Sequence, residues 1–329
     1  MVMSLERKPL VSVITATYRN FDHLKETMLS VFHQDYPCIE YIVTDDGSIN
    51  FPSDLVRDFV KKEKPDHIDF RLILNPENIG TVKNLNGAYR SARGEYYINL
   101  SCGDVFFNKT VISQIIDRFL TNESDVVVTS RIAYREDFNP ICLLPHYDER
   151  KIISRMESGF DQYKALITNR YYDMASGSAM SYSRRIMEEM SFFDEKYRLW
   201  EDGPFLAKYL QRGKLDCAYD IISIWYEIGG VSTQRTKIKN KSRSILDQDI
   251  ELFNNEERLE QIRELPLIDR RRVQLKNLQF KYKDRRIRHL ISVLHPIEYI
   301  DSLIYIYRRK NRIGKDKQEI QRILEHSLM

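Results

Sequence analysis

The amino-acid sequence predicts an α/β protein built on a largely parallel sheet, and three observations support this. Short apolar runs rich in β-branched residues alternate with segments of helical periodicity. The run at 10–16 is mostly apolar and rich in β-branched residues, as a buried parallel strand is, and 39–43 is a second run of this kind. Both runs lead into polar, turn-forming residues. Because ligands of open α/β sheets bind beyond the carboxyl ends of the strands, these loops are expected to form a binding site.

The same pattern continues along the chain. Segments of strand character lie at 10–16, 39–43, 70–74, 96–100, 125–129, 176–182 and 220–226. Segments of helical periodicity lie at 23–33, 52–64, 81–92, 109–120, 161–169, 184–190 and 204–211. Gly94 follows the third helix, where a C′ glycine in the left-handed conformation is favoured. The stretch 131–149 contains two prolines and is expected to be irregular.

Composition indicates a globular protein of one large or two medium domains. The chain has 329 residues, of which 42 % are apolar and 30 % charged, with a net charge of only +3. Its four cysteines are far apart, which favours reduced thiols over disulfides or a metal cluster. No signal-like segment and no apolar run of about 20 residues occurs. We therefore expect a cytoplasmic protein and no nucleic-acid partner.

Carboxylates follow two of the predicted parallel strands. Asp45 and Asp46 come directly after the strand at 39–43, and Asp104 follows the strand at 96–100. We expect all three near one rim of the sheet. A GxGxxG or P-loop motif does not follow the first strand, which argues against dehydrogenases and P-loop kinases.

Five motifs carry a family resemblance over roughly residues 9–235. The segments SVITATYRN, VTDDGS, NIGTVKNLNGAYRSARGEY, LSCGD and LWED occur in this order. In order and spacing they resemble the family-2 glycosyltransferases, inverting enzymes of the GT-A fold that use nucleotide-sugar donors. The resemblance implies a Rossmann-like nucleotide-binding sheet with an acceptor subdomain, followed here by a helical C-terminal tail.

Nucleotide-binding residues follow from this resemblance. Thr17 and Tyr18, in the loop after the first strand, would line the nucleotide base. Asp46 would hydrogen-bond the base, and Asp45 would support the loop. The resemblance favours UDP or dTDP as the nucleotide.

The resemblance also implies which residues contact the ribose and the diphosphate of the donor. The segment Asn78–Lys83 and Asn86 would border the ribose and diphosphate, with Lys83 available to the diphosphate charge. Arg235 and Lys237, after a glycine-rich segment, are the other cations considered for this role.

Asp104 matches the last acid of the family's metal-binding motif, with Gly103 beside it at the donor. The family pattern resembles LDADD, whereas this chain has Leu100-Ser101-Cys102-Gly103-Asp104 and keeps only the final carboxylate. Mg²⁺ or Mn²⁺ can still be held by one carboxylate, diphosphate oxygens and water. The resemblance thus implies a divalent cation at Asp104.

Asp202 matches the catalytic base of the family. In an inverting transfer, a carboxylate takes the proton of the acceptor hydroxyl as this hydroxyl attacks the anomeric carbon. Trp200 and Phe205 flank Asp202 with apolar bulk. The acceptor implied is a glycan or a lipid-linked saccharide of bacterial polysaccharide synthesis.

The same carboxylates also suit roles outside sugar transfer. Asp45-Asp46 before Gly-Ser suits any tight turn, and Glu201-Asp202 could cap the helix at 204–211. A receiver-type signalling module would also place acids after two strands. A catalytically dead binding or scaffold protein with a transferase fold is the main alternative, because Ser101–Gly103 lack carboxylates.

The character of the chain changes near residue 236. We predict a catalytic domain over 1–236 and a helical C-terminal region over 237–329. Helical periodicity is clear at 243–263 and 269–282, and an apolar stripe follows at 287–307, which Pro296 should kink or split. Basic clusters flank the stripe: Arg285, Arg286 and Arg288 before it, and Arg308, Arg309, Lys310 and Arg312 after it. This pattern suits an anionic membrane surface, which would place the protein at the inner face of the plasma membrane, and it equally suits a homodimer or packing on the catalytic domain.

Overall fold

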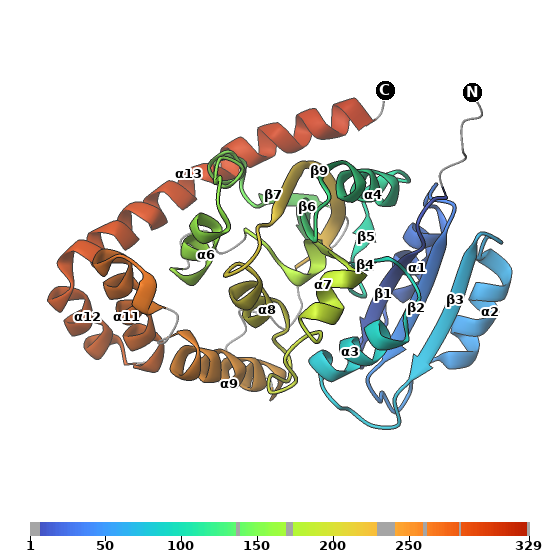
Figure 1. The fold of residues 1–329 in the computed structure, drawn as a ribbon, viewed down its shortest axis with the longest axis horizontal. Helices are drawn as coiled ribbons and strands as arrows, with labels where there is room; N and C mark the ends of the chain where they lie inside the picture. The colour runs from blue at the N-terminus through green and yellow to red at the C-terminus, as the bar shows by residue number, and fades with distance from the viewer. Residues whose placement is uncertain are drawn as a thin grey trace.

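The computed structural model describes residues 7–135, 139–168, 174–228, 241–258, 262–282 and 284–327. A mixed sheet forms the centre, helices cover both of its faces, and the C-terminal helices extend to one side (Figure 1). Two large buried clusters pack against the two faces of the sheet.

The sheet contains nine strands within the described residues. They are β1 (Val11–Thr17), β2 (Ile39–Asp45), β3 (Ile68–Leu74), β4 (Tyr96–Asn99), β5 (Val105–Phe106), β6 (Val126–Arg135), β7 (Asn139–Leu144), β8 (Met180–Ser183) and β9 (Asp216–Glu227). Their order is β3-β2-β1-β4-β8-β6-β9-β5, with β7 paired to β6. The first four strands of this order are mutually parallel, and β8 is antiparallel to both of its neighbours. The predicted parallel α/β arrangement is confirmed for the first half of the chain.

The helices of the α/β part connect these strands. They are α1 (Leu24–Phe32), α2 (Ser53–Glu63), α3 (Thr81–Ser91), α4 (Val111–Asn122), α5 (Tyr147–Ile153), α6 (Gly159–Ile167), α7 (Arg184–Glu189) and α8 (Asp202–Tyr209). In α3 the apolar residues at helical spacing are buried, with Val82 and Tyr89 fully enclosed. For α3, hydrophobic periodicity therefore located both the helix and the face that it buries.

Two predictions about chain geometry are wrong. The stretch 131–149, expected to be irregular, contains the end of β6, the strand β7 and the start of α5. Gly94 does not take the left-handed C′ conformation, since Ala92 ends α3 in an extended conformation. Gly94 instead lies against β1, where an added Cβ would stand 2.5 Å from the Ser12 backbone nitrogen. Close approach of two backbones explains this glycine.

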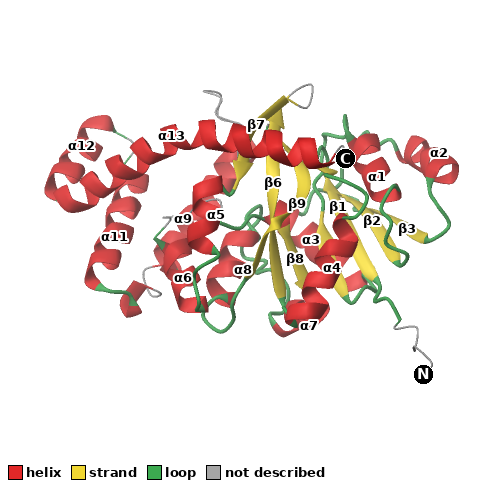
Figure 2. Ribbon diagram, turned by 90° about the horizontal axis from the view of Figure 1, so that it is seen from above, coloured by secondary structure: helices red, strands yellow, loops and turns green. Residues whose placement is uncertain are grey.

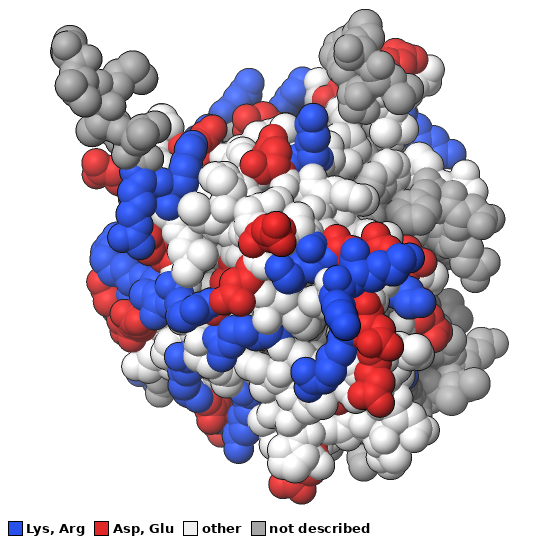
Figure 3. Space-filling view, turned by 90° about the vertical axis from the view of Figure 1, so that its right-hand side faces the viewer, with Lys and Arg blue, Asp and Glu red and all other residues white. Residues whose placement is uncertain are grey.

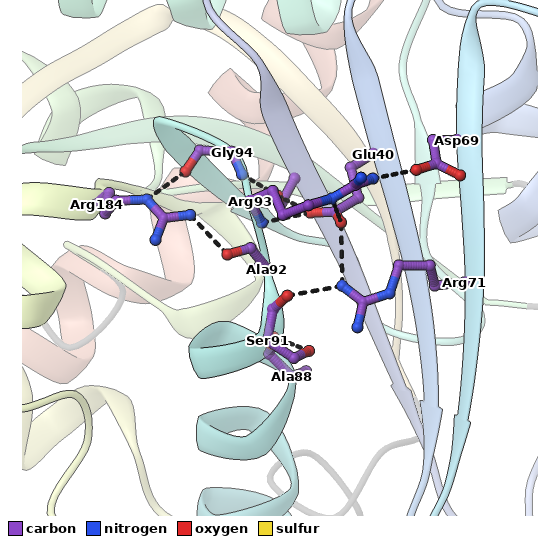
Figure 4. A network of polar contacts seen from close by, with 10 residues as sticks. Glu40, Asp69, Arg71, Ala88, Ser91, Ala92, Arg93, Gly94 and Arg184 are labelled. Carbon is purple, nitrogen blue, oxygen red and sulfur yellow. Dashed lines mark hydrogen bonds and ion pairs between the residues drawn. The ribbon is translucent and has the colours of Figure 1, made fainter.

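A buried carboxylate holds the amino-terminal ends of the parallel strands together (Figure 4). Glu40 of β2 has a fully buried side chain and accepts hydrogen bonds from Ser12 Oγ at 2.6 Å and Arg93 N at 2.8 Å. Arg71 Nη1 and Arg93 Nε lie 3.1 and 2.9 Å from its Oε1. Burial alone raises the pKa of Glu40, but the hydrogen bonds from Ser12, Arg93 and Arg71 outweigh it and lower the pKa.

Glu40→Ala is expected to destabilise the fold by about 2–3 kcal/mol, because it leaves buried donors without an acceptor. Since its folded-state pKa is lowered, Glu40 stabilises the fold fully above its ordinary pKa of 4.5, and this contribution is lost as pH falls through the folded-state pKa. Urea unfolding at pH 7 and at lower pH measures both effects. Asp69→Ala is the control, because Asp69 is exposed and pairs with Arg93 at the surface. Equal losses for the two variants would contradict this account.

Charges of both signs cover the β3 edge of the sheet. Over the face that contains α2 and β3, Lys and Arg side chains lie beside Asp and Glu (Figure 3). Asp69 and Arg71 of β3 belong to this mixed surface. Charged side chains on an edge strand disfavour pairing with a strand of another chain.

The C-terminal helices begin beside the loop that precedes α8, and the last of them returns across the sheet. They are α9 (Lys241–Glu256), α11 (Leu267–Lys281), α12 (Arg285–Leu294) and α13 (Pro296–Ser327), with a short 3₁₀ turn at Ile262–Glu264. The chain splits into α12 and α13 at Pro296, as predicted. The last turns of α13 lie over β7 (Figure 2), where Ile320 joins a cluster with Leu143.

Polar contacts also fix α13 on the sheet. Asp316, which is fully buried, accepts a hydrogen bond from Tyr147 N at 2.9 Å and contacts His146 Nδ1. Arg312 pairs with Glu149 of α5 and is only 8 % exposed. Arg312, grouped from the sequence with the basic residues after the apolar stripe, is therefore used inside the fold and is not available to a membrane surface. Among the described helices none is long and apolar enough to cross a membrane.

Candidate active site

Two adjoining cavities open at the carboxyl ends of the parallel strands. The first, of about 170 Å³, extends over the ends of β1 and β4 and the start of α3. The second, of about 400 Å³, lies between the loop after β4 and the start of α8. They share lining residues, namely Thr81, Ser101, Gly177, Ser178 and Glu201. The two cavities therefore form one continuous depression where the fold class places a ligand.

The end of β1 presents Thr17 and Tyr18 to the first cavity. Parallel pairing sets Thr17 opposite Asp45, and Thr17 Oγ1 donates a 2.9 Å hydrogen bond to Asp45 Oδ1. Tyr18 is 37 % exposed, and the Arg19 guanidinium lies 4.9 Å from its ring centre. An exposed aromatic ring at a cavity wall can stack on a planar base.

Asp45 and Asp46 have different surroundings despite their adjacency. Asp45 is buried and accepts hydrogen bonds from Ser48 N at 2.7 Å and Ser48 Oγ at 2.8 Å, in addition to Thr17. Asp45 does not line either cavity, whereas Asp46 lines the first. In the structure Asp45 thus closes its own loop, and Asp46 faces the depression.

The carboxylate of Asp46 is held by the loop before α3. Its Oδ1 accepts from Ile79 N at 2.8 Å, and its Oδ2 accepts from Gly80 N at 3.0 Å and Asn78 Nδ2 at 2.7 Å. Burial raises the pKa of Asp46, against the opposing effects of the Ile79 and Gly80 amides and of Arg198. A carboxylate has about four acceptor positions, so Oδ1 keeps one for a ligand N–H.

Lys83 and Asn86 lie away from the two cavities. Lys83 is exposed on α3 and lines neither of them. Asn86 is fully buried and bonds the Phe193 backbone through both of its amide atoms, at 2.9 and 3.0 Å. Thr81 and Asn84 of the same helix do line the first cavity. The helix α3 therefore lines the first cavity with Thr81 and Asn84, and not with the Lys83 and Asn86 that the resemblance implied.

Asp104 lines the second cavity and has one unsatisfied oxygen. It is 2 % exposed; its Oδ1 accepts from Glu227 N at 3.0 Å, while its Oδ2 is buried without a hydrogen-bond partner. Burial raises the pKa of Asp104 to about 7; the Glu227 amide and Arg131 oppose this shift and the Glu227 charge adds to it. Gly103, with φ of +100°, donates its N–H to Thr27 Oγ1 at 3.1 Å.

The chemistry of the Asp104 surroundings suits a divalent cation. A buried carboxylate oxygen without a partner is costly, and Mg²⁺ and Mn²⁺ prefer such oxygen ligands. Within the described ranges no three His, Cys, Asp or Glu residues gather into a metal-binding group. Asp104 would thus hold a cation together with oxygens from outside its own loop.

Asp202 is the first residue of α8 and faces the second cavity. Its Oδ2 accepts from Gly177 N at 2.8 Å, and its Oδ1 accepts from Gly203 N at 2.7 Å. Each carboxylate oxygen retains a second lone pair. Glu201, at the N-cap of α8, makes no capping hydrogen bond with its side chain.

Sequence reasoning missed two carboxylates that build this part of the site. Glu201 lines both cavities, and burial, followed by the charge of Asp202, raises its pKa to about 8. Asp249 of α9 accepts from Leu199 N at 2.6 Å and Trp200 N at 3.1 Å, and so fixes the loop that leads to Asp202. The charge of Glu201 beside Asp202 was a local signal, whereas nothing in the sequence linked Asp249 to this loop.

Sequence reasoning also missed Arg131, which is buried and supports the segment whose Gly177 N–H bonds Asp202. Its Nη1 donates to Ser176 Oγ at 2.9 Å and Ser178 Oγ at 2.8 Å, and both serines line the second cavity. Arg235 and Lys237, named from the sequence as candidate cations, lie outside the described residues.

The sequence of this chain is similar to those of known glycosyltransferases. A family model described as "Glycosyl transferase family 2" matches residues 12–191. TuaG of Bacillus subtilis, named as a candidate teichuronic acid biosynthesis glycosyltransferase, is 34 % identical over 97 residues, which are 30 % of this chain and 37 % of TuaG. EpsJ of the same organism, an uncharacterized glycosyltransferase, is 24 % identical over 202 residues, covering 60 % of this chain and 55 % of EpsJ. The chain thus matches only part of the length of each relative.

Solved structures share the fold. Residues 1–349 of TarS from S. aureus, in complex with UDP-GlcNAc, match with a TM-score of 0.54 and 16 % identity over 92 % of each chain. The mannosyltransferase PcManGT from Pyrobaculum calidifontis, in complex with GDP-Man and Mn²⁺, matches with a TM-score of 0.55 and 14 % identity, covering 88 % of this chain and 74 % of that one.

These comparisons settle the fold and the family. The architecture is the GT-A fold followed by a helical C-terminal region, as expected from the motifs. The family model covers more than half of the chain, including the loops around Asp46 and Asp104. The chain belongs to glycosyl transferase family 2.

Proposed function

We propose that this protein is an inverting glycosyltransferase that moves a sugar from a nucleoside-diphosphate sugar to a glycan or lipid-linked saccharide. UDP or dTDP is the preferred nucleotide, and Asp202 is the general base. The observation that carries the proposal is the continuous depression, which has Asp46 at one end and both Asp104 and Asp202 at the other.

The two cavities suit different substrates. The first cavity, with Tyr18 and the remaining acceptor position of Asp46, suits a nucleobase that offers a planar face and an N–H. The second cavity, with Trp200 and Asp202, suits the acceptor sugar. The shared wall around Thr81 and Ser101 then lies where the donor sugar and diphosphate meet the acceptor.

The surroundings of Asp202 support its proposed role as the base. The amides of Gly177 and Gly203 hold its carboxylate at the cavity wall, and a lone pair remains on each oxygen. A carboxylate so fixed can take the proton from an acceptor hydroxyl within hydrogen-bond reach. The proton leaves the hydroxyl as its oxygen forms the new bond to the anomeric carbon, and the nucleoside diphosphate leaves from the opposite face.

The leaving diphosphate needs positive charge. Asp104 would hold Mg²⁺ or Mn²⁺, which offsets the negative charge that develops on the diphosphate. Lys83, Arg235 and Lys237 remain candidates from the resemblance for the same task. The Mn²⁺ in the PcManGT complex supports the choice of cation.

Names of similar proteins support a substrate class. TarS is complexed with UDP-GlcNAc, and TuaG is named for teichuronic acid biosynthesis. We infer a donor of the UDP-sugar type and an acceptor in bacterial surface polysaccharide synthesis. The relevant compartment is then the cytoplasm.

A thermal-shift screen of nucleoside diphosphates and nucleotide sugars, with and without Mn²⁺, tests the proposal first. UDP or dTDP at about 100 times its Kd should raise Tm by roughly 5 °C, because a ligand that binds only the folded state stabilises it. The shift should increase with Mn²⁺. The absence of a response to every nucleotide would contradict the proposal and favour the catalytically dead scaffold.

An exposed apolar surface suggests where the protein acts. On α12 and the first half of α13, large apolar side chains face solvent, with Leu294 69 % and Ile297 62 % exposed. This α12–α13 face consists of Ile287, Leu290, Val293, Leu294, Ile297, Ile300, Leu303, Ile304 and Tyr307. Many large apolar side chains exposed on successive turns of two neighbouring helices favour an interaction site there.

We propose that an anionic membrane surface covers the α12–α13 face. Arg286 and Arg288 are exposed at its start, and three basic residues, Arg308 to Lys310, follow it in the sequence. Basic residues near a lipid surface contribute about 1 kcal/mol each toward anionic headgroups. Residues 237–329 would then serve both to dock the enzyme at the inner face of the plasma membrane and, through Asp249, to support the site.

A further inference from the structure

We propose that Glu227, the last residue of β9, is the second carboxylate of the divalent-cation site and acts with Asp104. This inference rests on the proposed function, since it concerns the cation that supports a leaving diphosphate. Glu227 lies 123 residues after Asp104 in the chain, and no motif quoted for the family resemblance contains it.

Glu227 and Asp104 are in direct contact. Glu227 N donates a 3.0 Å hydrogen bond to Asp104 Oδ1, which ties the end of β9 to the loop after β4. Both residues line the second cavity. Asp104 Oδ2 is buried and unpaired, so it is available for a cation. A cation would satisfy this oxygen and reduce the repulsion between two neighbouring carboxylates.

The Glu227 carboxylate lies in the space beside Gly103. A Cβ added at residue 103 would stand 2.4 Å from Glu227 Oε2, so the Glu227 carboxylate occupies room that a side chain there would need. Residues 101–103 carry no carboxylate of their own. The carboxylate of Glu227, from β9, lies beside this loop instead. Glu227 restores the charge that the family motif would have supplied locally.

One other group competes for Glu227. His23 Nε2 lies 3.8 Å from Glu227 Oε1, and this histidine side chain is 52 % exposed. An exposed ion pair contributes little to stability, so it does not by itself explain the position of Glu227. If Glu227 served only His23, removal of the imidazole would have the same consequences as removal of the carboxylate.

The test measures Mn²⁺ binding directly on the full chain. Free Mn²⁺ is followed by its electron paramagnetic resonance signal during titration of the protein, first with Mn²⁺ alone and then with UDP present. Glu227→Gln keeps the side-chain size, and melting curves verify that it folds. It should weaken Mn²⁺ binding by at least about tenfold in both series, because loss of a direct ligand should cost no less than loss of a second-shell partner.

Matched variants separate the alternatives. Asp104→Asn should weaken Mn²⁺ binding at least as much, whereas His23→Ala and the distant Glu63→Gln should leave it unchanged. UDP affinity without Mn²⁺ should be the same in Glu227→Gln and the native protein.

Three outcomes would overturn the inference: native Mn²⁺ affinity in Glu227→Gln, an equal loss in His23→Ala, or no Mn²⁺ binding by the native protein. Failure of UDP to bind would instead overturn the proposed function, while the titration with Mn²⁺ alone would still decide the role of Glu227.

Discussion

Asp202→Asn is expected to lower kcat by about 10²–10⁴-fold while the protein still binds its nucleotide. General-base catalysis contributes an effect of this size, and asparagine cannot accept the acceptor's proton. The amide can keep the hydrogen bond from Gly177 N or from Gly203 N, so the loop geometry should change little. Initial rates with saturating donor, together with calorimetric titration of UDP, measure the two effects separately.

The control for this prediction is Asp66→Asn. Asp66 is exposed in the turn before β3, at the amino-terminal end of the parallel strands, and lines neither cavity. This variant removes the same charge and should retain the native rate. Near-native transfer by Asp202→Asn would remove Asp202 from the role of base and would point to its neighbour Glu201.

Replacing four residues of the α12–α13 face with glutamine should abolish binding to anionic vesicles. The variant combines changes at Leu290, Leu294, Ile297 and Ile304, each of which is at least 45 % exposed. Burying one such side chain contributes about 1.5–3 kcal/mol, so losing four should lower vesicle partitioning by at least about 100-fold. Co-sedimentation with phosphatidylglycerol vesicles, compared with neutral vesicles, gives the measurement.

Leu55 and Ile49 provide the apolar control. They are 64 % and 89 % exposed but lie in the N-terminal half of the chain, on elements other than α12 and α13. Their double change to glutamine should leave vesicle binding intact. A native protein that ignores vesicles but is dimeric in light scattering, and becomes monomeric with the four changes, would contradict the membrane proposal and assign the face to a second copy.

The parallel half of the fold could be predicted because its signals are local. The β2 sequence Ile39–Asp45 is buried throughout, so its apolar run marked a strand without knowledge of its neighbours. The polar loops that follow such strands meet at one edge of the sheet by topology alone. The region 131–149 could not be predicted in this way, because β7 is defined by its pairing with β6.

Packing decided which of the candidate residues face the cavities. Asp45 and Asp46 are chemically identical, but successive residues at a strand end point to opposite sides, and Asp46 is the one that lines the depression. Lys83 and Asn86 belong to a helix whose rotation is set by its buried face, which turns both of them away.

The sequence by itself determined the fold class, the family and the loops at which the site forms, because these follow from periodicity and from short motifs. Only the tertiary structure placed Glu227 beside Asp104 and Asp249 under the loop that leads to Asp202. Both contacts join residues that lie far apart in the chain. The free energy that selects such contacts comes from packing whole elements together, which no local pattern encodes.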